Sequence, residues 1–178
     1  MPPQTNSHKS NTVDDLPITV VFLCSGNVIR SAYAELVFAK MISEEDCLRG
    51  RINVQSGGVT YRNIRIYPEI EEYLLQEGID PHQIDSFQPR HIRDHSELLA
   101  EAGLILVMTR EHLTRIPKAY QEKAYLLYQY AFGKPLEIPD PYFEPPMERA
   151  VSLLKKALKG LFKRMKAEIC VEMDEFYE

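Results

Sequence analysis

The stretch ITVVFLCSGNVIRS, residues 18–31, predicts a strand, a tight loop and the start of a helix in direct succession. Residues 18–23 are almost all apolar and mostly β-branched, which is typical of a strand buried on both faces of a parallel sheet. Gly26 and Asn27 tolerate the unusual backbone angles that a tight loop requires. From Ser31 onward apolar residues recur every three or four positions, which predicts a helix.

Strands and helices go on alternating along the rest of the chain. Three further strands are expected, at residues 52–56, 104–108 and 124–127. The expected helices lie at residues 68–77 and 110–116 and from Met147 onward. Gly57 and Gly58 are expected to end the second strand. The alternation argues for one α/β domain at residues 17–178, a mainly parallel four-stranded sheet with helices on both faces, after a flexible tail at residues 1–16.

Composition and charge exclude several classes of partner. The chain has 44% apolar residues, enough for a substantial core. Its formal charge of -5 argues against a nucleic-acid partner, because phosphate backbones attract clustered cations. The densest basic run, residues 155–166, alternates with apolar residues at helical spacing and is expected to be the solvated face of a helix. Because neither a signal peptide nor a run of about 20 apolar residues is present, we expect a cytoplasmic protein with no membrane partner.

The cysteines Cys24, Cys47 and Cys170 are widely spaced. Their spacing matches neither a zinc site nor a redox dithiol, and their odd number suggests no disulfide framework. We therefore expect Cys47 and Cys170 to be unpaired thiols in a reducing compartment.

The loop after the first strand has the composition of an anion site. In parallel sheets, ligands bind beyond the carboxyl ends of the strands, where this loop lies. Its backbone N–H groups and the start of the following helix provide unpaired donors, which together can form a cradle of the size of a phosphate. Arg30 can curl back to present its guanidinium fork opposite Cys24. The same cradle favours the thiolate form of Cys24, which makes it a nucleophile beneath a bound phosphate.

A simpler interpretation exists for Cys24 and Arg30. A cysteine after a strand is commonly a small buried apolar residue, and a Cys with an Arg six positions later also occurs by chance. The catalytic interpretation depends on the coincidence of a strand before the thiol, Gly26 inside the loop and a helix from Ser31.

Residues 21–31 resemble the signature of the low-molecular-weight protein tyrosine phosphatases. The resemblance extends to residues 56–58, 104–109 and 140–142, so it covers most of the chain from Ile18 to the final helix. It implies a small doubly wound α/β fold of the flavodoxin-like, three-layer kind. It also implies hydrolysis without metal or cofactor, and a substrate that is a phosphotyrosine-containing protein or a small aryl phosphate. We expect a monomer.

The resemblance assigns roles to the loop. Cys24 would attack phosphorus, while Arg30 and the loop amides would hold the phosphoryl oxygens through the transition state. The other phosphate-binding residues would be Ser25, Gly26, Asn27, Val28, Ile29 and Ser31. Ser31 would donate its hydroxyl to the thiolate, a role compatible with an ordinary helix N-cap. Asn27 either braces the loop through its side chain or is present for its left-handed backbone angles.

Two further segments complete the predicted site. Asp140 matches the family's Asp-Pro motif and would protonate the leaving phenolate, although an Asp before a Pro is commonly just a turn residue. Tyr142 and Tyr61 would form the walls of a slot for an aromatic ring, or would simply pack on the surface.

The chain departs from the family pattern at four positions. Ile29 replaces a second cysteine, so no disulfide with Cys24 can form inside the loop. Ala32 replaces a proline, and Phe87 lies where a loop-bracing histidine is expected. Val28 lacks the hydroxyl of the threonine that the phosphoarginine-specific branch carries there, which favours phosphotyrosine.

Other functions remain open. A thioredoxin-coupled arsenate reductase uses a similar loop but needs a relay of further cysteines. A phosphocysteine carrier or a phosphate-binding module would have no use for an acid such as Asp140. His91 and His95, four residues apart, have no evident third partner for a metal.

Overall fold

A computed structural model of the chain describes residues 16–174, so the predicted tail, residues 1–16, lies almost entirely outside the described part. The strands are β1 (Ile18–Cys24), β2 (Ile52–Gly58), β3 (Leu104–Val107) and β4 (Ala124–Leu126). The helices are α1 (Arg30–Ser43), α2 (Pro68–Gln76), α3 (Pro81–Asp85), α4 (Glu97–Ala100), α5 (Arg110–Thr114), α6 (Leu127–Phe132) and α7 (Met147–Asp174), with a 3-10 helix, η2, at Lys118–Lys123.

The four strands form one sheet in the order β2-β1-β3-β4, and every neighbouring pair is parallel. The predicted fold class, a doubly wound, flavodoxin-like α/β sandwich, is confirmed. Strand order reverses at β1, which has β2 on one side and β3 on the other. Cys24, the last residue of β1, therefore lies at the carboxyl edge of the sheet, beside the switch point where ligands bind in such folds.

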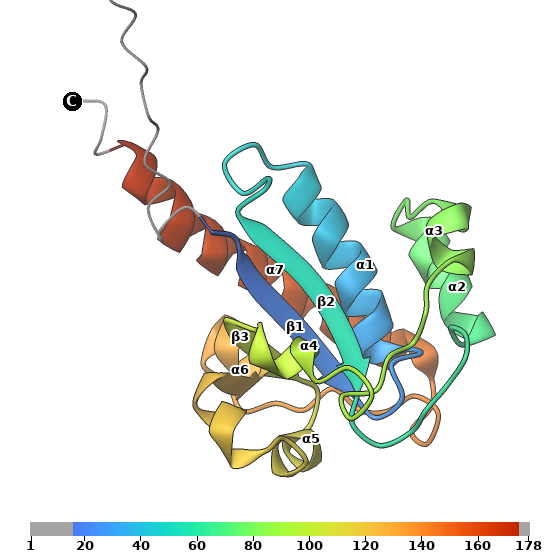
Figure 1. Ribbon diagram of the computed structural model, residues 1–178. Helices are drawn as coiled ribbons and strands as arrows, with labels where there is room; N and C mark the ends of the chain where they lie inside the picture. Colours follow the sequence, from blue (N-terminus) through green and yellow to red (C-terminus); the bar gives the residue numbers. More distant parts are fainter. Residues whose placement is uncertain (1–15, 175–178) are drawn as a thin grey trace, which may run out of the picture.

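Alternate residues of β1 enter two separate cores. Val20 and Phe22 belong to the larger core, which α1 and α7 cover. Val21 and Leu23 point to the opposite face and pack in a smaller core with residues of α4 and of the segment after α5. All four side chains are fully buried, as expected for a central parallel strand. Figure 1 shows α7 behind the sheet and α4 in front of it.

The second strand does not stop before the glycine pair, as predicted, but continues through it and ends two residues later than the predicted end at residue 56. Gly57 and Gly58 are the last two residues of β2, and Gly58 is paired in register with Cys24. A Cβ on Gly58 would lie 3.1 Å from both the backbone carbon of Gly26 and the carbonyl oxygen of Ser25. The glycine therefore allows the strand to pass directly against the loop that follows β1.

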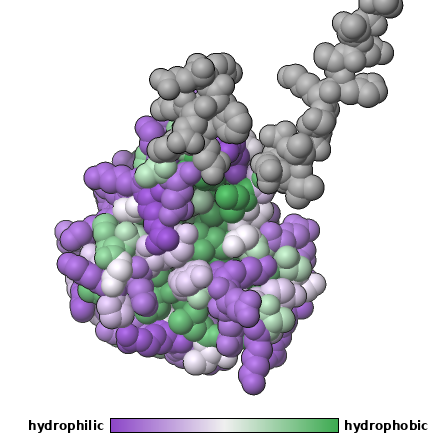
Figure 2. All heavy atoms as spheres, turned by 90° about the vertical axis from the view of Figure 1, so that its left-hand side faces the viewer, coloured by the Kyte–Doolittle hydropathy of each residue, from purple (hydrophilic) through white to green (hydrophobic). Residues whose placement is uncertain are grey.

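The basic run of α7 is solvated, as predicted. Its lysines and Arg164 are exposed, while Leu158 and Leu161 between them are fully buried. Figure 2, which shows the face on the left-hand side of Figure 1, has many hydrophilic residues on this face, with apolar residues visible between them. Within residues 16–174, none of the helices combines the length and apolar character that crossing a membrane requires.

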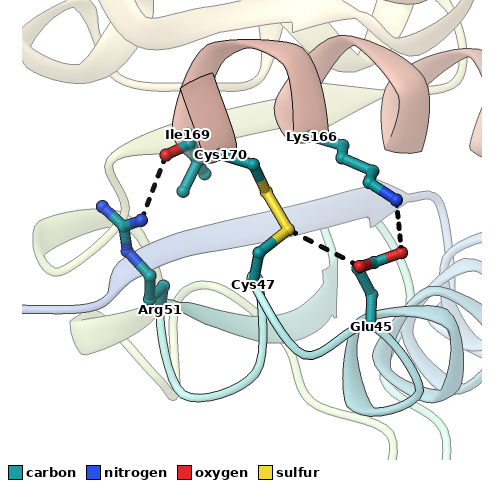
Figure 3. The surroundings of a disulfide bond; sticks show 6 residues. All are labelled: Glu45, Cys47, Arg51, Lys166, Ile169 and Cys170. Atoms are coloured by element: carbon teal, nitrogen blue, oxygen red, sulfur yellow. Dashed lines mark hydrogen bonds and ion pairs between the residues drawn. A yellow bond between two sulfur atoms is a disulfide. The ribbon is translucent and has the colours of Figure 1, made fainter. Parts of the chain in front are cut away.

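The prediction of unpaired Cys47 and Cys170 is wrong, because the two form a disulfide. Cys47 follows α1 and Cys170 lies near the end of α7, 123 positions later, with 5.8 Å between their Cα atoms. Among the polar contacts that Figure 3 shows beside it, Lys166 pairs with Glu45 at 2.7 Å, and Arg51 Nη1 donates to the carbonyl of Ile169 at 3.1 Å. The pairing was not foreseeable from spacing, since only the packing of α7 along α1 brings these segments together.

Removal of this disulfide should cause a large decrease in the free energy of unfolding. Closing a chain loop of this length lowers the entropy of the unfolded state, which corresponds to about 3–5 kcal/mol. The double variant Cys47→Ser/Cys170→Ser should lower the free energy of unfolding by that amount in urea titrations without reductant. With reductant present, the variant and the parent protein should differ by less than about 1 kcal/mol. Titration of three free thiols in the unreduced, denatured parent protein would contradict the pairing.

Candidate active site

The loop between β1 and α1 forms the floor of a cavity of about 470 Å³ at the carboxyl edge of the sheet. The loop residues that line the cavity are Cys24, Ser25, Gly26, Val28, Ile29 and Arg30, and the other lining residues are Tyr61, Asn63, Tyr67, Asp140, Tyr142 and Phe143. Cys24 and Arg30, at the two ends of the loop, are only 3% and 2% exposed. The structure thus brings the predicted thiol, arginine, acid and two tyrosines to one cavity.

Carbonyls of the loop accept hydrogen bonds from the segment that follows β2. Val59 N donates to Cys24 O, and both Thr60 N and Tyr61 N donate to Ser25 O, each at 2.9 Å. Further along the loop, the side-chain amide of Asn63 donates to the carbonyl of residue 26 at 2.9 Å. The backbone N–H of residue 67 donates to the carbonyl of residue 28 at 3.0 Å. These contacts fix the peptide units with their carbonyls on the outer side of the loop.

The backbone amides of the loop, in contrast, have no hydrogen-bond partner in the part of the chain that the structure describes. Within residues 16–174, the backbone N–H groups of residues 25–31 donate no hydrogen bond. Buried N–H groups in native proteins nearly always have a partner. A set of free amides next to a cavity, at the N-terminus of α1, is therefore a site for an anion.

The side chain and the backbone of Asn27 both matter. Its φ of 57° lies in the left-handed region. Its amide nitrogen donates to Ser31 Oγ at 2.9 Å and to Ser56 Oγ at 2.7 Å, and its side-chain oxygen accepts from Arg90 N at 2.9 Å. Both interpretations left open by the sequence therefore hold. Phe87, at the position of the expected histidine, packs in the core. The hydrogen bond that braces the Asn27 side chain comes instead from the backbone N–H of Arg90.

These contacts lead to the sulfur of Cys24. Ser31 Oγ lies 3.0 Å from Cys24 Sγ and 3.3 Å from the carbonyl of Gly57. Because Ser31 Oγ already accepts from Asn27, its hydrogen is free for the sulfur or that carbonyl. The structure is thus compatible with the predicted donation to a thiolate. The other role considered for Ser31, that of helix N-cap, does not apply, because Ser31 lies inside α1 and Ile29 is the N-cap residue.

A half-buried carboxylate, that of Glu35, lies at the far end of the same network. Ser56 Oγ donates to Glu35, and Arg90 Nη2 donates to the same carboxylate oxygen at 3.3 Å. Burial raises the pKa of Glu35, and the contacts with Ser56 and Arg90 partly oppose that rise. Glu35 was not singled out from the sequence, since an acidic residue in an amphipathic helix is usually solvated.

Arg30 holds the loop and the Asp140 segment together. Its Nη1 donates to the carbonyl of Ile138 at 3.1 Å, and its Nη2 pairs with Asp140 Oδ2 at 2.8 Å. The other oxygen of Asp140 accepts from Tyr142 N at 3.1 Å, so Asp140 is also the turn residue that its place before a proline suggests. The side chain of Asp140 is 22% exposed and faces the cavity, where it can exchange protons with a bound molecule.

Aromatic side chains surround the opening of the cavity. Tyr142 and Phe143 are 64% and 66% exposed, and their rings meet edge to face at 4.9 Å. Tyr142 also contacts Tyr67 edge to face, at 6.1 Å between ring centres. Tyr61, 54% exposed, lines the same cavity. The predicted pair, Tyr61 and Tyr142, therefore borders the site together with two aromatic residues that sequence reasoning missed.

His112, at the start of α5, is a second residue beside the loop that the sequence did not reveal. It is 2% exposed, and its Nε2 lies 3.0 Å from Ser25 Oγ. Burial, followed by the charges of Arg30 and Arg115, lowers the pKa of His112 to about 3. A histidine next to a strand end, two residues into a helix, carries no motif that separates it from an ordinary surface histidine.

The two histidines considered for a metal have other contacts. His91 Nδ1 accepts from Arg93 N at 3.1 Å, and His95 pairs with Glu97 at 3.0 Å. Among residues 16–174 no group of three or more His, Cys, Asp or Glu side chains is arranged to hold a metal ion.

Comparison with known proteins places this geometry in a family context. The family model described as low molecular weight phosphotyrosine protein phosphatase matches residues 19–171. The chain is 29% identical over 154 residues to the protein-arginine-phosphatase of Bacillus subtilis, covering 81% of this chain and 97% of that protein. It is 27% identical over 158 residues to the low molecular weight protein-tyrosine-phosphatase YfkJ of the same organism, covering 85% and 97%.

Solved structures agree with this. The crystal structure of YfkJ from Bacillus subtilis superposes with a TM-score of 0.72 at 25% identity, over 85% of this chain and 96% of that one. A cysteine-to-serine mutant of the YwlE arginine phosphatase, with a phosphorylated active site serine, superposes with a TM-score of 0.70 at 27% identity, over 84% and 96%.

The low pKa of His112 predicts a loss of stability in acid. Its pKa is near 6.5 in the unfolded chain and about 3 in the folded one. Between these values the unfolded state takes up a proton that the folded state refuses. The free energy of unfolding should therefore fall by about 1.4 kcal/mol per pH unit as the pH drops below about 6.5.

Urea unfolding of the parent protein and of His112→Gln, at pH values between about 4 and 7, checks this contribution. The variant cannot take up the proton, so its stability should vary less with pH. The raised pKa of Glu35 acts in the opposite direction, since a proton held by the folded state is lost as the pH rises, but it acts equally in both proteins. Parallel stability curves for the two proteins would contradict the prediction.

Proposed function

Because the chain belongs to the low molecular weight phosphotyrosine protein phosphatase family, a family of hydrolases, we propose that it hydrolyses phosphotyrosine through a phosphocysteine on Cys24. The observation that carries this proposal is the set of free loop amides next to a buried thiol and a buried arginine. The family model covers residues 19–171, which supports our proposal of one catalytic domain at residues 17–178.

In the first step the thiolate of Cys24 attacks phosphorus, the S–P bond forms and the P–O bond to the aryl group breaks. Asp140 gives its proton to the departing phenolate oxygen. The loop amides and Arg30 stabilise the charge on the three remaining phosphoryl oxygens. When substrate binds, its phosphoryl oxygens replace Asp140 as the partner of Arg30 Nη2. The Asp140 side chain is then available next to the leaving group.

In the second step water attacks the phosphocysteine, and Asp140 accepts the proton that the water loses. The S–P bond breaks and its electron pair returns to Cys24. Ser31, which lies 3.0 Å from the sulfur and itself accepts from Asn27, stabilises the departing thiolate. The phosphorylated serine in the cysteine-to-serine mutant of the YwlE arginine phosphatase supports a covalent phosphoenzyme route.

An aryl substrate fits the rest of the cavity. Tyr142, Phe143 and Tyr61 offer ring faces and edges around its opening, and aromatic rings pack well in such settings. Val28 presents only methyl groups to the cavity. Phosphoarginine hydrolysis is the second candidate, because the protein-arginine-phosphatase of Bacillus subtilis is among the relatives.

An arsenate reductase and a phosphocysteine carrier have less support. An arsenate reductase relay needs further free thiols, and among residues 16–174 Cys24 is the one cysteine outside a disulfide. A carrier or binding module has no need for an acid beside the thiol. The monomeric state and the cytoplasmic location stay proposals. The location is supported by the need to keep Cys24 reduced, and no longer by the spacing of Cys47 and Cys170.

Replacement of the nucleophile tests the mechanism. Cys24→Ser should lower turnover of p-nitrophenyl phosphate by about 10⁴-fold or more, because a serine hydroxyl is not ionised at neutral pH. Binding of inorganic phosphate, measured by calorimetry, should persist, since the amides and Arg30 remain. EDTA should leave the parent enzyme unchanged. Full turnover by Cys24→Ser, or inhibition by EDTA, would exclude the mechanism.

The role of Asp140 predicts a dependence on the leaving group. Asp140→Asn should slow phosphotyrosine hydrolysis by about 10²–10⁴-fold, because phenolate leaves poorly without a proton. The loss should be smaller for p-nitrophenyl phosphate, whose leaving group needs less protonation. Equal losses for the two substrates would assign Asp140 to positioning Arg30 instead.

A substrate panel separates the candidate functions. The purified protein should hydrolyse phosphotyrosine faster than phosphoarginine or phosphoserine and should show no arsenate-dependent oxidation of thioredoxin. Val28→Thr restores a hydroxyl to the cavity wall and should shift the ratio toward phosphoarginine. Faster hydrolysis of phosphoarginine by the parent protein would establish the second candidate.

A further inference from the structure

We propose that His112 orients the hydroxyl of Ser25 as an additional hydrogen-bond donor to the phosphoryl group, so that the loop binds its oxyanion with a side-chain hydroxyl as well as with backbone amides. This inference rests on the proposed function and adds a positioning residue, His112, to it. Four observations carry the inference: the tautomer of His112, its burial, the partners of Ser25 and the place of Ser25 in the cavity.

The tautomer of His112 follows from its backbone contact. Thr109 N donates to His112 Nδ1 at 3.2 Å, so Nδ1 carries no proton. The neutral imidazole must then carry its proton on Nε2, the atom 3.0 Å from Ser25 Oγ. His112 is therefore the donor in this contact and Ser25 the acceptor.

The surroundings of His112 keep the ring neutral. The side chain is buried, and the guanidinium groups of Arg30 and Arg115 face it, so a second proton is strongly disfavoured. The pKa of about 3 places this neutral form across the whole neutral range. The direction of the hydrogen bond to Ser25 is thus constant under the conditions in which a thiolate enzyme works.

Ser25 has a free hydrogen as a consequence. Its Oγ accepts from His112 and, at 3.4 Å, from Arg30 Nη2. A hydroxyl oxygen has two lone pairs and one hydrogen, so two donors occupy the lone pairs and leave the hydrogen to point elsewhere. Within residues 16–174 that hydrogen has no acceptor. Ser25 lines the cavity beside the free amides, so a phosphoryl oxygen is the acceptor that fits.

A simpler role for His112 has to be separated from this one. His112 lies in the first turn of α5, where its Nδ1 accepts the otherwise unpaired N–H of Thr109. That contact stabilises the helix start and would need no contact with Ser25. The two roles use different ring nitrogens, so two substitutions can divide them.

The experiment measures binding of inorganic phosphate by calorimetry, with no turnover involved. Ser25→Ala should weaken binding about ten- to hundredfold, the range for a hydrogen bond to a charged group. Ser25→Thr keeps the hydroxyl and should stay within about threefold of the parent protein. Unchanged affinity in Ser25→Ala would overturn the proposal.

Two substitutions at His112 form a matched pair. His112→Gln places an amide nitrogen near the position of Nε2 and should keep phosphate binding close to that of the parent protein. His112→Asn places an amide oxygen near Nδ1, so it keeps the contact with Thr109, loses the donor to Ser25 and should weaken binding about three- to tenfold. The reverse order of the two variants would assign His112 to the helix start alone.

A double variant completes the test. If His112 acts through Ser25, then Ser25→Ala/His112→Asn should bind phosphate no more weakly than Ser25→Ala. Additive losses would show that His112 acts independently and would overturn the proposal. Thermal unfolding of each variant confirms that it is folded, and Ser25→Ala alone decides the point if a His112 variant is not. Failure of the parent protein to bind phosphate at all would instead refute the proposed function.

Discussion

The site depends on one set of hydrogen bonds, in which residues 59–67 hold the carbonyls of the loop after β1. Because Val59 N, Thr60 N and Tyr61 N donate to the carbonyls of Cys24 and Ser25, those carbonyls face away from the cavity. The peptide units then have free N–H groups, which would be costly to bury without an anion. The close approach this requires is possible because Gly58, the last residue of β2, has no side chain. The close packing of the loop after β1 against the segment that follows β2 thus gives the site its preference for an anion.

Two polar networks converge on this loop from opposite sides. On one side, Asn27 connects the thiol end of the loop through Ser56 to the half-buried carboxylate of Glu35. On the other side, His112 approaches Ser25 from the start of α5. The residues at the centre of the two networks, Asn27, Ser31, Ser56 and His112, are buried, so their hydrogen bonds compete little with water. Such support keeps the loop in one geometry, which is what charge stabilisation in a transition state requires.

The disulfide lies at the opposite end of the molecule from this cavity. Cys47 follows the C-terminal end of α1, and the cavity loop precedes its N-terminal end, so the length of α1 separates them. The bond joins this end to the last turns of α7, whose apolar face covers the larger core. The disulfide that stabilises the fold and the Cys24 site therefore lie in different parts of the same domain. Loss of the disulfide should weaken the fold without removing any group from the cavity.

The sequence by itself determined the α/β class, the strand-loop-helix around Cys24, and the meeting of Cys24, Arg30 and Asp140. These features follow from local patterns: apolar runs, helical periodicity and a motif whose residues are contiguous or match a family signature. Only the tertiary structure decided that Cys47 pairs with Cys170 and that His112 and Glu35 support the loop. Those contacts join residues separated by 21 to 123 positions, and their side-chain types occur as readily on a solvated surface. Burial and partner identity are properties of packing between elements, and no periodicity in the chain encodes them.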